Sequence, residues 1–289
     1  MKITLDINQE SCIKCGKCVR VCPSNIFVQS KADGIVGLVD VHSCIACGHC
    51  VAVCPTDSVL HSEFPAEKVH SIDYSQLPTP EQMMLLCKAR RSNRSITSKP
   101  VPTEMLDQII EAAHCAPTAT NAQTVSFTLV NDPQKLLQIS NFTIATFDGL
   151  LKILQNPVAK LLLKPFLHGV YKYVPVFERL KQDHVSGEDP ILRKATALLL
   201  IHTPKSNRFG CEDSNLAYQN ASLMAECLGV SQVYMGFVLT AIKQKKSVFA
   251  RLMGVDGDVH AIMALGMPAY RYPKYVDRKE AEIRKFSKK

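Results

Sequence analysis

Several features that would point to a function are missing from this 289-residue sequence. No run of eighteen apolar residues occurs, so we expect no transmembrane helix. Nothing at the N-terminus resembles a secretory signal, which argues against an extracellular disulfide scaffold although the chain holds twelve cysteines. Basic and aromatic residues are not interleaved, so nucleic acid is not an expected partner.

Common catalytic signatures are also absent. We find no HExxH, no Walker loop, no GxGxxG after a strand and no Ser/His/Asp triad. The nine histidines are scattered, and we interpret them as structural or surface residues. No side chain is therefore predicted to be catalytic. We expect the reaction to take place on a bound cofactor, with protons supplied by solvent.

Cysteine is the most informative residue that is present. Eight of the twelve cysteines form two copies of the pattern Cys-x-x-Cys-x-x-Cys-x-x-x-Cys-Pro, at residues 12–23 and 44–55. The two-residue gaps let three sulfurs of one loop face a common point, as an iron–sulfur cluster requires. Zinc fits less well, because it usually takes two CxxC pairs from separate loops. The repeated spacing predicts iron–sulfur ligation.

Residues 1–62 resemble a bacterial-type ferredoxin that holds two [4Fe–4S] clusters. In that arrangement the fourth cysteine of each run ligates the other cluster. Cluster one is expected to use Cys12, Cys15, Cys18 and Cys54, and cluster two Cys44, Cys47, Cys50 and Cys22. Ligation would stabilise a domain too small to fold on apolar burial alone. Reduced cysteines and clusters predict a cytoplasmic location, sheltered from oxygen as in an anaerobe.

The formal net charge of +8 lies outside this first domain, because residues 1–62 hold five basic and five acidic residues. Two oxidised clusters would each carry about −2, which would offset part of the charge. We interpret the excess as phosphate ligands together with a solvated C-terminal tail.

The chain is predicted to contain a cluster domain at 1–62, a proline-containing linker at 63–81 and a second domain at 82–289. Helices and strands intermix in the second domain, which indicates an α+β sandwich. The expected elements are a helix from Pro80 towards Ala89, a helix capped by Thr103, strands at 125–130, 196–201 and 259–265, and a helix at 215–228. Cys115 and Cys227 fall on apolar helix stretches and are expected in the core.

Residues 134–190 are expected to form a helical insertion packed on this core. Two alternatives stay open at this stage: an active-site lid, or a basic amphipathic helix that touches a membrane surface.

Three separated stretches of the second domain suggest a second chemical site. The stretch Arg90–Arg94 (RRSNR) suits an anion, because arginine forks bind oxygens in pairs. A polar loop, APTATNAQ at 116–123, follows a helix and could approach a flat ring. A glycine-containing turn, VYMGF, occupies 233–237.

In this order, the stretches resemble the FMN-dependent nitroreductase family, and the whole chain resembles a ferredoxin–nitroreductase fusion. The resemblance implies that Arg90, Ser92 and Arg94 hold the FMN phosphate, ribityl chain and pyrimidine edge. Arg91, which lies between them, is expected to add a backbone or side-chain contact. The resemblance also implies that a backbone amide at Met235 or Gly236 points at flavin N5, and that Arg278 with Lys274 or Lys279 forms the late phosphate-binding pair. Pro117, Thr118, Ala119 and Asn121 match a loop that comes from the partner subunit, so a homodimer with FMN at the interface is expected.

The sequence departs from the family pattern in two places. Many members have an acidic residue where Met235 stands, and many have Pro and Trp where this chain has Thr124 and Val125. The second difference affects the wall that would face a substrate.

The combined prediction is an oxidoreductase in which two [4Fe–4S] clusters pass electrons to FMN, which reduces a small electron-poor acceptor such as a nitroaromatic or quinone-like compound. Reduced ferredoxin is the expected donor, with NAD(P)H as a second possibility. The alternative is a non-catalytic relay or redox sensor that docks to a protein partner.

Overall fold

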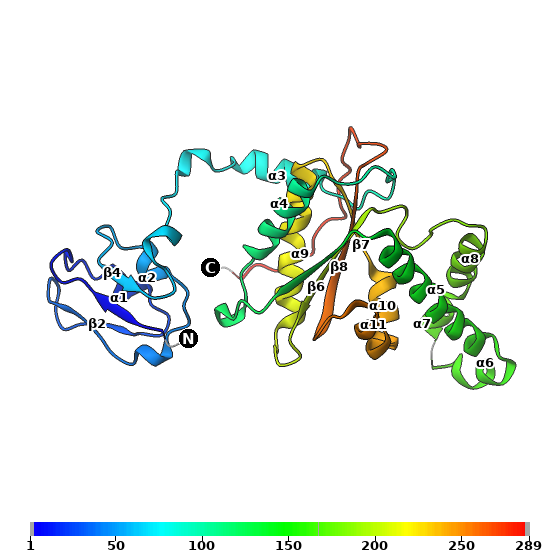
Figure 1. The fold of residues 1–289 in the computed structure, drawn as a ribbon, viewed down its shortest axis with the longest axis horizontal. Coiled ribbons are helices and arrows are strands. Elements are labelled where there is room, and N and C mark those ends of the chain that lie inside the picture. The colour runs from blue at the N-terminus through cyan, green and yellow to red at the C-terminus, as the bar shows by residue number, and fades with distance from the viewer. Residues whose placement is uncertain (1–2, 167, 287–289) are drawn as a thin grey trace. The chain divides into compact units, whose positions relative to one another are not determined.

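A computed structural model describes residues 3–166 and 168–286, and the chain divides into two units (Figure 1). The first unit contains the chain up to Leu77 together with the short segment Thr118–Gln123. The second contains Pro78–Pro117 and the chain from Thr124 onward. The break between Leu77 and Pro78 falls inside the segment predicted as a linker.

Two small antiparallel sheets build the first unit. Strand β1 (Leu5–Ile7) pairs with β4 (Val59–His61), and β2 (Phe27–Gln29) pairs with β3 (Val36–Leu38). Helices α1 (Lys17–Val21) and α2 (His49–Ala52) lie inside the two cysteine runs. Short 3₁₀ turns complete the unit at Val41–Ser43, Ala66–Lys68 and Tyr74–Gln76.

The backbone of the first unit repeats with an offset of 32 residues, as the cysteine runs do. Lys14 and Ala46 both have positive φ, at 58° and 49°, and so do Asn25 and Asp57, at 51° and 50°. Gly16 and Gly48 precede α1 and α2 with φ of 64° and 73°, a conformation that favours glycine. The two cysteine loops therefore have the same local conformation.

A four-stranded antiparallel sheet of order β5-β6-β8-β7 forms the centre of the second unit. Its strands are β5 (Ser126–Val130), β6 (Ala197–Thr203), β8 (Asp258–Gly266) and β7 (Ser231–Tyr234). Leu199 of β6 lies opposite Met263 of β8, and both side chains are fully buried. The three strands predicted in this domain are confirmed.

Helices cover both faces of this sheet (Figure 1). On β6, Leu198 and Leu200 pack into one apolar layer, while Leu199 and Ile201 pack into the other, because successive side chains of a strand alternate. One layer includes α4 (Thr103–His114) and α9 (Gly210–Cys227); the other includes α5 (Pro133–Gln155), α8 (Val174–Val185), α10 (Gly236–Gln244) and α11 (Lys246–Met253). The α+β sandwich predicted from the sequence is confirmed.

Small residues bring α9 close to the sheet. Ala217, Ala221 and Ala225 recur every four residues on one face of this helix, and each is at most 1% exposed. The helix begins at Gly210, five residues earlier than the sequence pattern predicted.

Two predicted helix starts had different outcomes. Helix α3 (Pro80–Ala89) begins as expected, with Pro80 in its first turn and a reciprocal capping box between Thr79 and Gln82. The prediction that Thr103 caps α4 was wrong. Pro102 occupies the cap position without a side-chain hydrogen bond, and Thr103 is the first helical residue.

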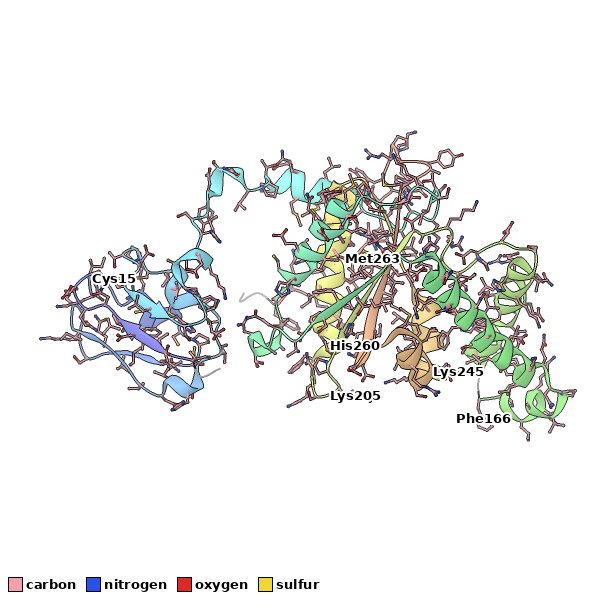
Figure 2. The ribbon with its side chains drawn as sticks, in the orientation of Figure 1. Cys15, Phe166, Lys205, Lys245, His260 and Met263 are labelled. Atoms are coloured by element: carbon pink, nitrogen blue, oxygen red, sulfur yellow. The ribbon has the colours of Figure 1, made fainter. Side chains whose placement is uncertain are left out.

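Helices α5, α6 (Pro157–Leu163), α7 (His168–Tyr171) and α8 occupy the segment predicted as an insertion. Phe147 of α5 stacks on Phe177 of α8, with ring centroids 4.5 Å apart, which joins these two helices through the core. Phe166 lies at the far end of the insertion and is 85% exposed (Figure 2). Among the described residues, none of the helices is both long and apolar enough to span a bilayer.

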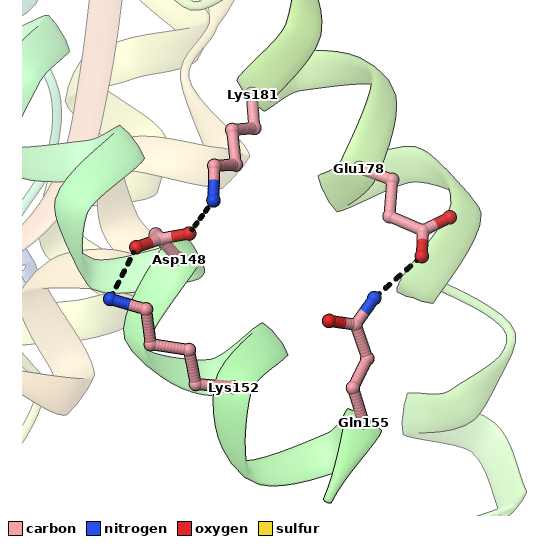
Figure 3. A network of polar contacts seen from close by, with 5 residues as sticks. All are labelled: Asp148, Lys152, Gln155, Glu178 and Lys181. Atoms are coloured by element: carbon pink, nitrogen blue, oxygen red, sulfur yellow. Dashed lines mark hydrogen bonds and ion pairs between the residues drawn. The ribbon is translucent and has the colours of Figure 1, made fainter.

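A polar network joins α5 and α8 at their surface (Figure 3). Asp148 accepts from Lys152 at 3.0 Å and from Lys181 at 2.5 Å, and Gln155 Nε2 donates to Glu178 at 2.6 Å. Hydrogen bonds from Lys181 and Lys152 lower the pKa of the Asp148 carboxyl.

Asp148→Asn is expected to lower the free energy of unfolding by less than about 1 kcal/mol, because exposed ion pairs contribute little. The pKa of Asp148 is depressed in the folded state, so its contribution is present above the ordinary aspartate pKa of about 4 and is lost as pH falls below it. Denaturant unfolding of wild type and variant, at several pH values and salt concentrations, measures this. A difference that persists at pH 2 or in high salt would contradict it; the exposed Asp107 of α4 provides the matched Asp→Asn control.

Candidate cofactor sites

Two of the cluster cysteines, Cys18 and Cys50, have other cysteines as electrostatic neighbours. Burial raises the pKa of the Cys18 thiol, and the neighbouring Cys12 and Cys54 raise it further. Burial likewise raises the pKa of Cys50 to about 11, together with Cys44 and Cys47. Cys54 comes from the second run, yet its electrostatic neighbour Cys18 belongs to the first. The neighbours of Cys18 therefore include the crossing ligand expected for cluster one, whereas those of Cys50 come from its own run.

Backbone amides point at three of these sulfurs. Ser58 N–H donates to Cys54 Sγ at 3.3 Å, Ala46 N–H to Cys44 Sγ at 3.4 Å, and Ile26 N–H to Cys22 Sγ at 3.5 Å. Although burial raises the pKa of Cys54, hydrogen bonds from the Thr56 and Ser58 amides bring it below the ordinary value. Such donors stabilise thiolate ligands, so the donor set fits clusters.

A mononuclear metal site is not formed in the described part of the chain. No three His, Cys, Asp or Glu side chains there are arranged to hold a single metal ion. A [4Fe–4S] cluster binds each of its four thiolates through a different iron atom. Its cysteine sulfurs therefore lie further apart than the ligands of a single zinc ion do.

His61 is a candidate residue that the sequence reasoning missed. Its side chain is 5% exposed and lies against Phe64, with ring centroids 4.9 Å apart. Nε2 lies 3.4 Å from Cys44 Sγ, and Nδ1 accepts from the Glu63 N–H at 3.1 Å. Burial lowers the pKa of His61, and the neighbouring Glu63 opposes this shift.

The polar loop predicted to contact FMN from a partner subunit belongs to the first unit from Thr118 to Gln123, whereas Pro117 belongs to the second. Asn121 Nδ2 donates to the Ile45 carbonyl at 3.0 Å and to the Ala46 carbonyl at 2.8 Å. The Gln123 N–H donates to Thr118 Oγ1 at 3.0 Å, which closes the loop on itself. These carbonyls lie between Cys44 and Cys47 in the second cysteine loop, a contact that the sequence did not indicate.

The Arg90–Arg94 stretch runs beside strand β7 in the second unit. Ser92 forms a parallel bridge with Gln232, whose Nε2 donates to the Arg91 carbonyl at 3.3 Å. The Oε1 atom of Gln232 accepts from Tyr218 at 2.6 Å. Gln232 is 1% exposed, so this buried amide positions the arginine stretch. Sequence reasoning missed it, because one glutamine in an apolar strand resembles an ordinary core position.

A cavity of about 320 Å³ opens beside this stretch. Its lining comprises Leu85, Ala89, Arg91, Asn93, Glu226, Gly229, Val230, Ser231, Pro268, Arg271, Tyr272, Pro273, Lys274 and Tyr275. The Arg91 guanidinium lies 4.5 Å from the centre of the Tyr272 ring, and Asn93 Nδ2 donates to the Tyr270 carbonyl at 2.8 Å. The cavity thus brings together Arg91 and Lys274, two residues predicted to bind FMN that lie far apart in sequence.

The charges of this cavity favour an anion. Arg91, Arg271 and Lys274 line the cavity together with one carboxylate, Glu226. Burial raises the pKa of Glu226, although Arg90 and Arg271 oppose this shift. The buried Ser231 hydroxyl has no hydrogen-bond partner among the described residues. A buried polar group without a partner suggests a missing ligand. Three cations and a free hydroxyl therefore fit a phosphate group.

The remaining predicted residues lie in different settings. The Met235 N–H donates to the Ile262 carbonyl at 3.0 Å, so it is engaged within the fold. Gly236 begins α10, and no atom lies within 4 Å of the place where its Cβ would be, so a flat ring could approach there. Arg94, Arg278 and Lys279 are exposed and do not line the cavity.

Two cysteines were predicted wrongly. Cys115 and Cys227 are exposed, not buried in the core. Cys115 follows the last residue of α4, and Cys227 is the last residue of α9. Both side chains are exposed because these helix ends extend beyond the part of the helix that packs on the core. Cys211 is also exposed, with Asn215 Nδ2 3.6 Å from its sulfur.

Comparisons with known proteins agree with this division of the chain. Residues 87–267 match the model of the nitroreductase family, and residues 4–55 match a 4Fe-4S dicluster domain. The FMN reductase [NAD(P)H] of Bacillus subtilis (strain 168) is 30% identical over 148 residues, which is 51% of this chain and 51% of that protein. Iodotyrosine deiodinase 1 of Rattus norvegicus is 39% identical over 75 residues, covering 23% of this chain and 26% of the relative. The chain thus spans about half or less of the curated relatives it matches.

Solved structures show the same fold. A nitroreductase with bound FMN from Bacteroides fragilis NCTC 9343 superposes with a TM-score of 0.53 at 21% identity, over 71% of this chain and 99% of that chain. A nitroreductase with bound FMN from Desulfitobacterium hafniense DCB-2 superposes with a TM-score of 0.53 at 16% identity. The match covers 70% of this chain and 97% of that chain.

Proposed function

Since this chain belongs to the nitroreductase family, we propose that it is an FMN-dependent oxidoreductase whose flavin receives electrons through two [4Fe–4S] clusters. The acceptor is a small electron-poor molecule, such as a nitroaromatic or a quinone-like compound. The observation that carries the proposal is that one chain holds both the paired cysteine sets and the cation-lined cavity beside β7. The proposal places the protein in the cytoplasm, where its cysteine thiols would stay reduced.

The chain's own residues would bind and orient the flavin. Arg91, Arg271 and Lys274 are placed to bind its phosphate, and the Ser231 hydroxyl is available to donate to it. The open space over Gly236 leaves room for the ring beside a backbone amide. When bound, FMN supplies two-electron chemistry that one-electron clusters can feed. No side-chain acid is assigned, since solvent can deliver protons.

The proposal includes a homodimer in which the loop at 117–121 of one subunit contacts the flavin of the other. FMN-bound relatives of the same fold support the flavin, and the cluster domain supports a one-electron donor such as reduced ferredoxin. Direct reduction by NAD(P)H is the competing route, in line with the name of the Bacillus subtilis relative, FMN reductase [NAD(P)H].

An anaerobic donor comparison tests the proposal. Iron, sulfide and FMN are quantified in the reconstituted protein, and flavin bleaching is then followed with reduced ferredoxin or with NADH. Bleaching by reduced ferredoxin, with transfer to a nitroaromatic or quinone acceptor, supports the enzyme. Bleaching without turnover of any such acceptor favours a relay or sensor, and a protein that binds no FMN contradicts both.

A further inference from the structure

The two halves of the cluster unit differ at one pair of equivalent positions. The 32-residue offset that relates Cys12 to Cys44 also relates Gln29, the last residue of β2, to His61, the last residue of β4. Gln29 Nε2 donates to the carbonyls of Lys14 and Gly34, at 2.9 and 2.8 Å. Gln29 therefore holds backbone, whereas His61 reaches a sulfur.

The hydrogen bonds of His61 define its tautomer. Its Nδ1 accepts from the Glu63 backbone N–H, so Nδ1 carries no proton in the neutral ring. The proton is then on Nε2, the nitrogen 3.4 Å from Cys44 Sγ. His61 is consequently a donor to a predicted ligand of cluster two, and the Phe64 ring holds its plane in place.

We propose that the Nε2–H···Sγ bond from His61 to Cys44 raises the reduction potential of cluster two above that of cluster one, so that cluster two holds the first electron. This inference rests on the two-cluster part of the proposed function. Adding one electron makes the cluster and its sulfurs more negative, and a hydrogen bond to sulfur stabilises that reduced form. The electron comes from the one-electron donor, and no covalent bond forms or breaks.

Cluster one has a weaker counterpart of this contact. Thr56 Oγ1 lies 3.8 Å from Cys54 Sγ, but the same hydroxyl pairs with Ser58 Oγ at 2.8 Å. The imidazole contact is shorter and its proton is not shared with a second side chain. His61 is thus a positioning residue for electrons, acting through Cys44.

An EPR-monitored redox titration of the full-length holoprotein tests this inference. The variants are His61→Phe, which keeps a ring beside Phe64 but removes the donor, and His61→Gln, which keeps an N–H. His70→Phe is the matched control, because it makes the same change at an exposed histidine of the same unit. At a fixed potential, His61→Phe is expected to lower the ratio of reduced to oxidised cluster two about tenfold, or 59 mV for a one-electron couple.

The midpoint potential of cluster one should stay unchanged in His61→Phe. His61→Gln should recover at least part of the shift in the midpoint of cluster two. Both midpoints of His70→Phe should match those of the wild type. Unchanged midpoints in a His61→Phe protein with full iron would overturn the inference. If His61→Phe binds less iron than the wild type, the wild-type titration is used instead. A midpoint of cluster two above that of cluster one then supports the inference, and coincident midpoints of the two clusters overturn it. A wild type with fewer than about eight irons contradicts the two-cluster proposal and this inference together, whereas coincident midpoints with full iron contradict the inference alone.

Discussion

Cys54→Ala is expected to lose about half of the iron and to reduce its flavin at least ~100-fold more slowly with a one-electron donor, because a cluster deprived of one thiolate is lost from the route. The lost cluster should be the one held by the first cysteine run, since Cys18 has Cys54 as an electrostatic neighbour. Iron and sulfide content, EPR spectra of the reduced protein and stopped-flow flavin bleaching measure this.

Comparison variants make the result specific. The EPR spectrum of Cys54→Ala should match that of Cys18→Ala and differ from that of Cys50→Ala, although Cys50 is the nearer residue in sequence. Cys87→Ala, at an exposed cysteine of α3, should keep all of its iron. A spectrum that matches Cys50→Ala would show that the fourth ligands do not cross between the runs.

Arg91→Ala is expected to weaken FMN binding by roughly 10- to 100-fold, because a hydrogen bond between charged groups contributes about 1.5–3 kcal/mol. Arg91 lines the cavity with Arg271 and Lys274, and Tyr272 supports its guanidinium. Titration of FMN into the apoprotein, followed by flavin fluorescence, gives the dissociation constant. Arg91→Lys should lie between the alanine variant and the wild type, since lysine keeps the charge but loses the fork.

Two further variants separate binding from folding. Ser231→Ala should also weaken FMN, by less than Arg91→Ala, yet should leave the stability of the apoprotein unchanged or higher, because its hydroxyl has no partner among the described residues. Arg251→Ala, on the exposed surface of α11, should bind FMN as the wild type does. Wild-type affinity in Arg91→Ala would mean that this cavity does not hold the phosphate.

Local pattern accounts for most of what could be predicted about the fold. The cysteine spacing indicates the ligands because three sulfurs of one short loop can meet without help from the rest of the chain. The buried strands β6 and β8 are continuous apolar runs, and Pro80 marks the start of α3. Cys115 and Cys227 were misplaced because an apolar pattern does not say where a helix stops facing the core.

The amino-acid sequence alone is enough to identify the repeated cysteine runs, the α+β class and the candidate anion-binding arginines, because each depends on spacing along the chain. Only the tertiary structure brings Arg91, Ser231 and Lys274 to one cavity, places Gln232 beneath the arginine stretch and puts His61 against Cys44. These contacts join residues 17 to 183 positions apart. They depend on how strands pair and helices pack, and no local pattern encodes a distance of that kind.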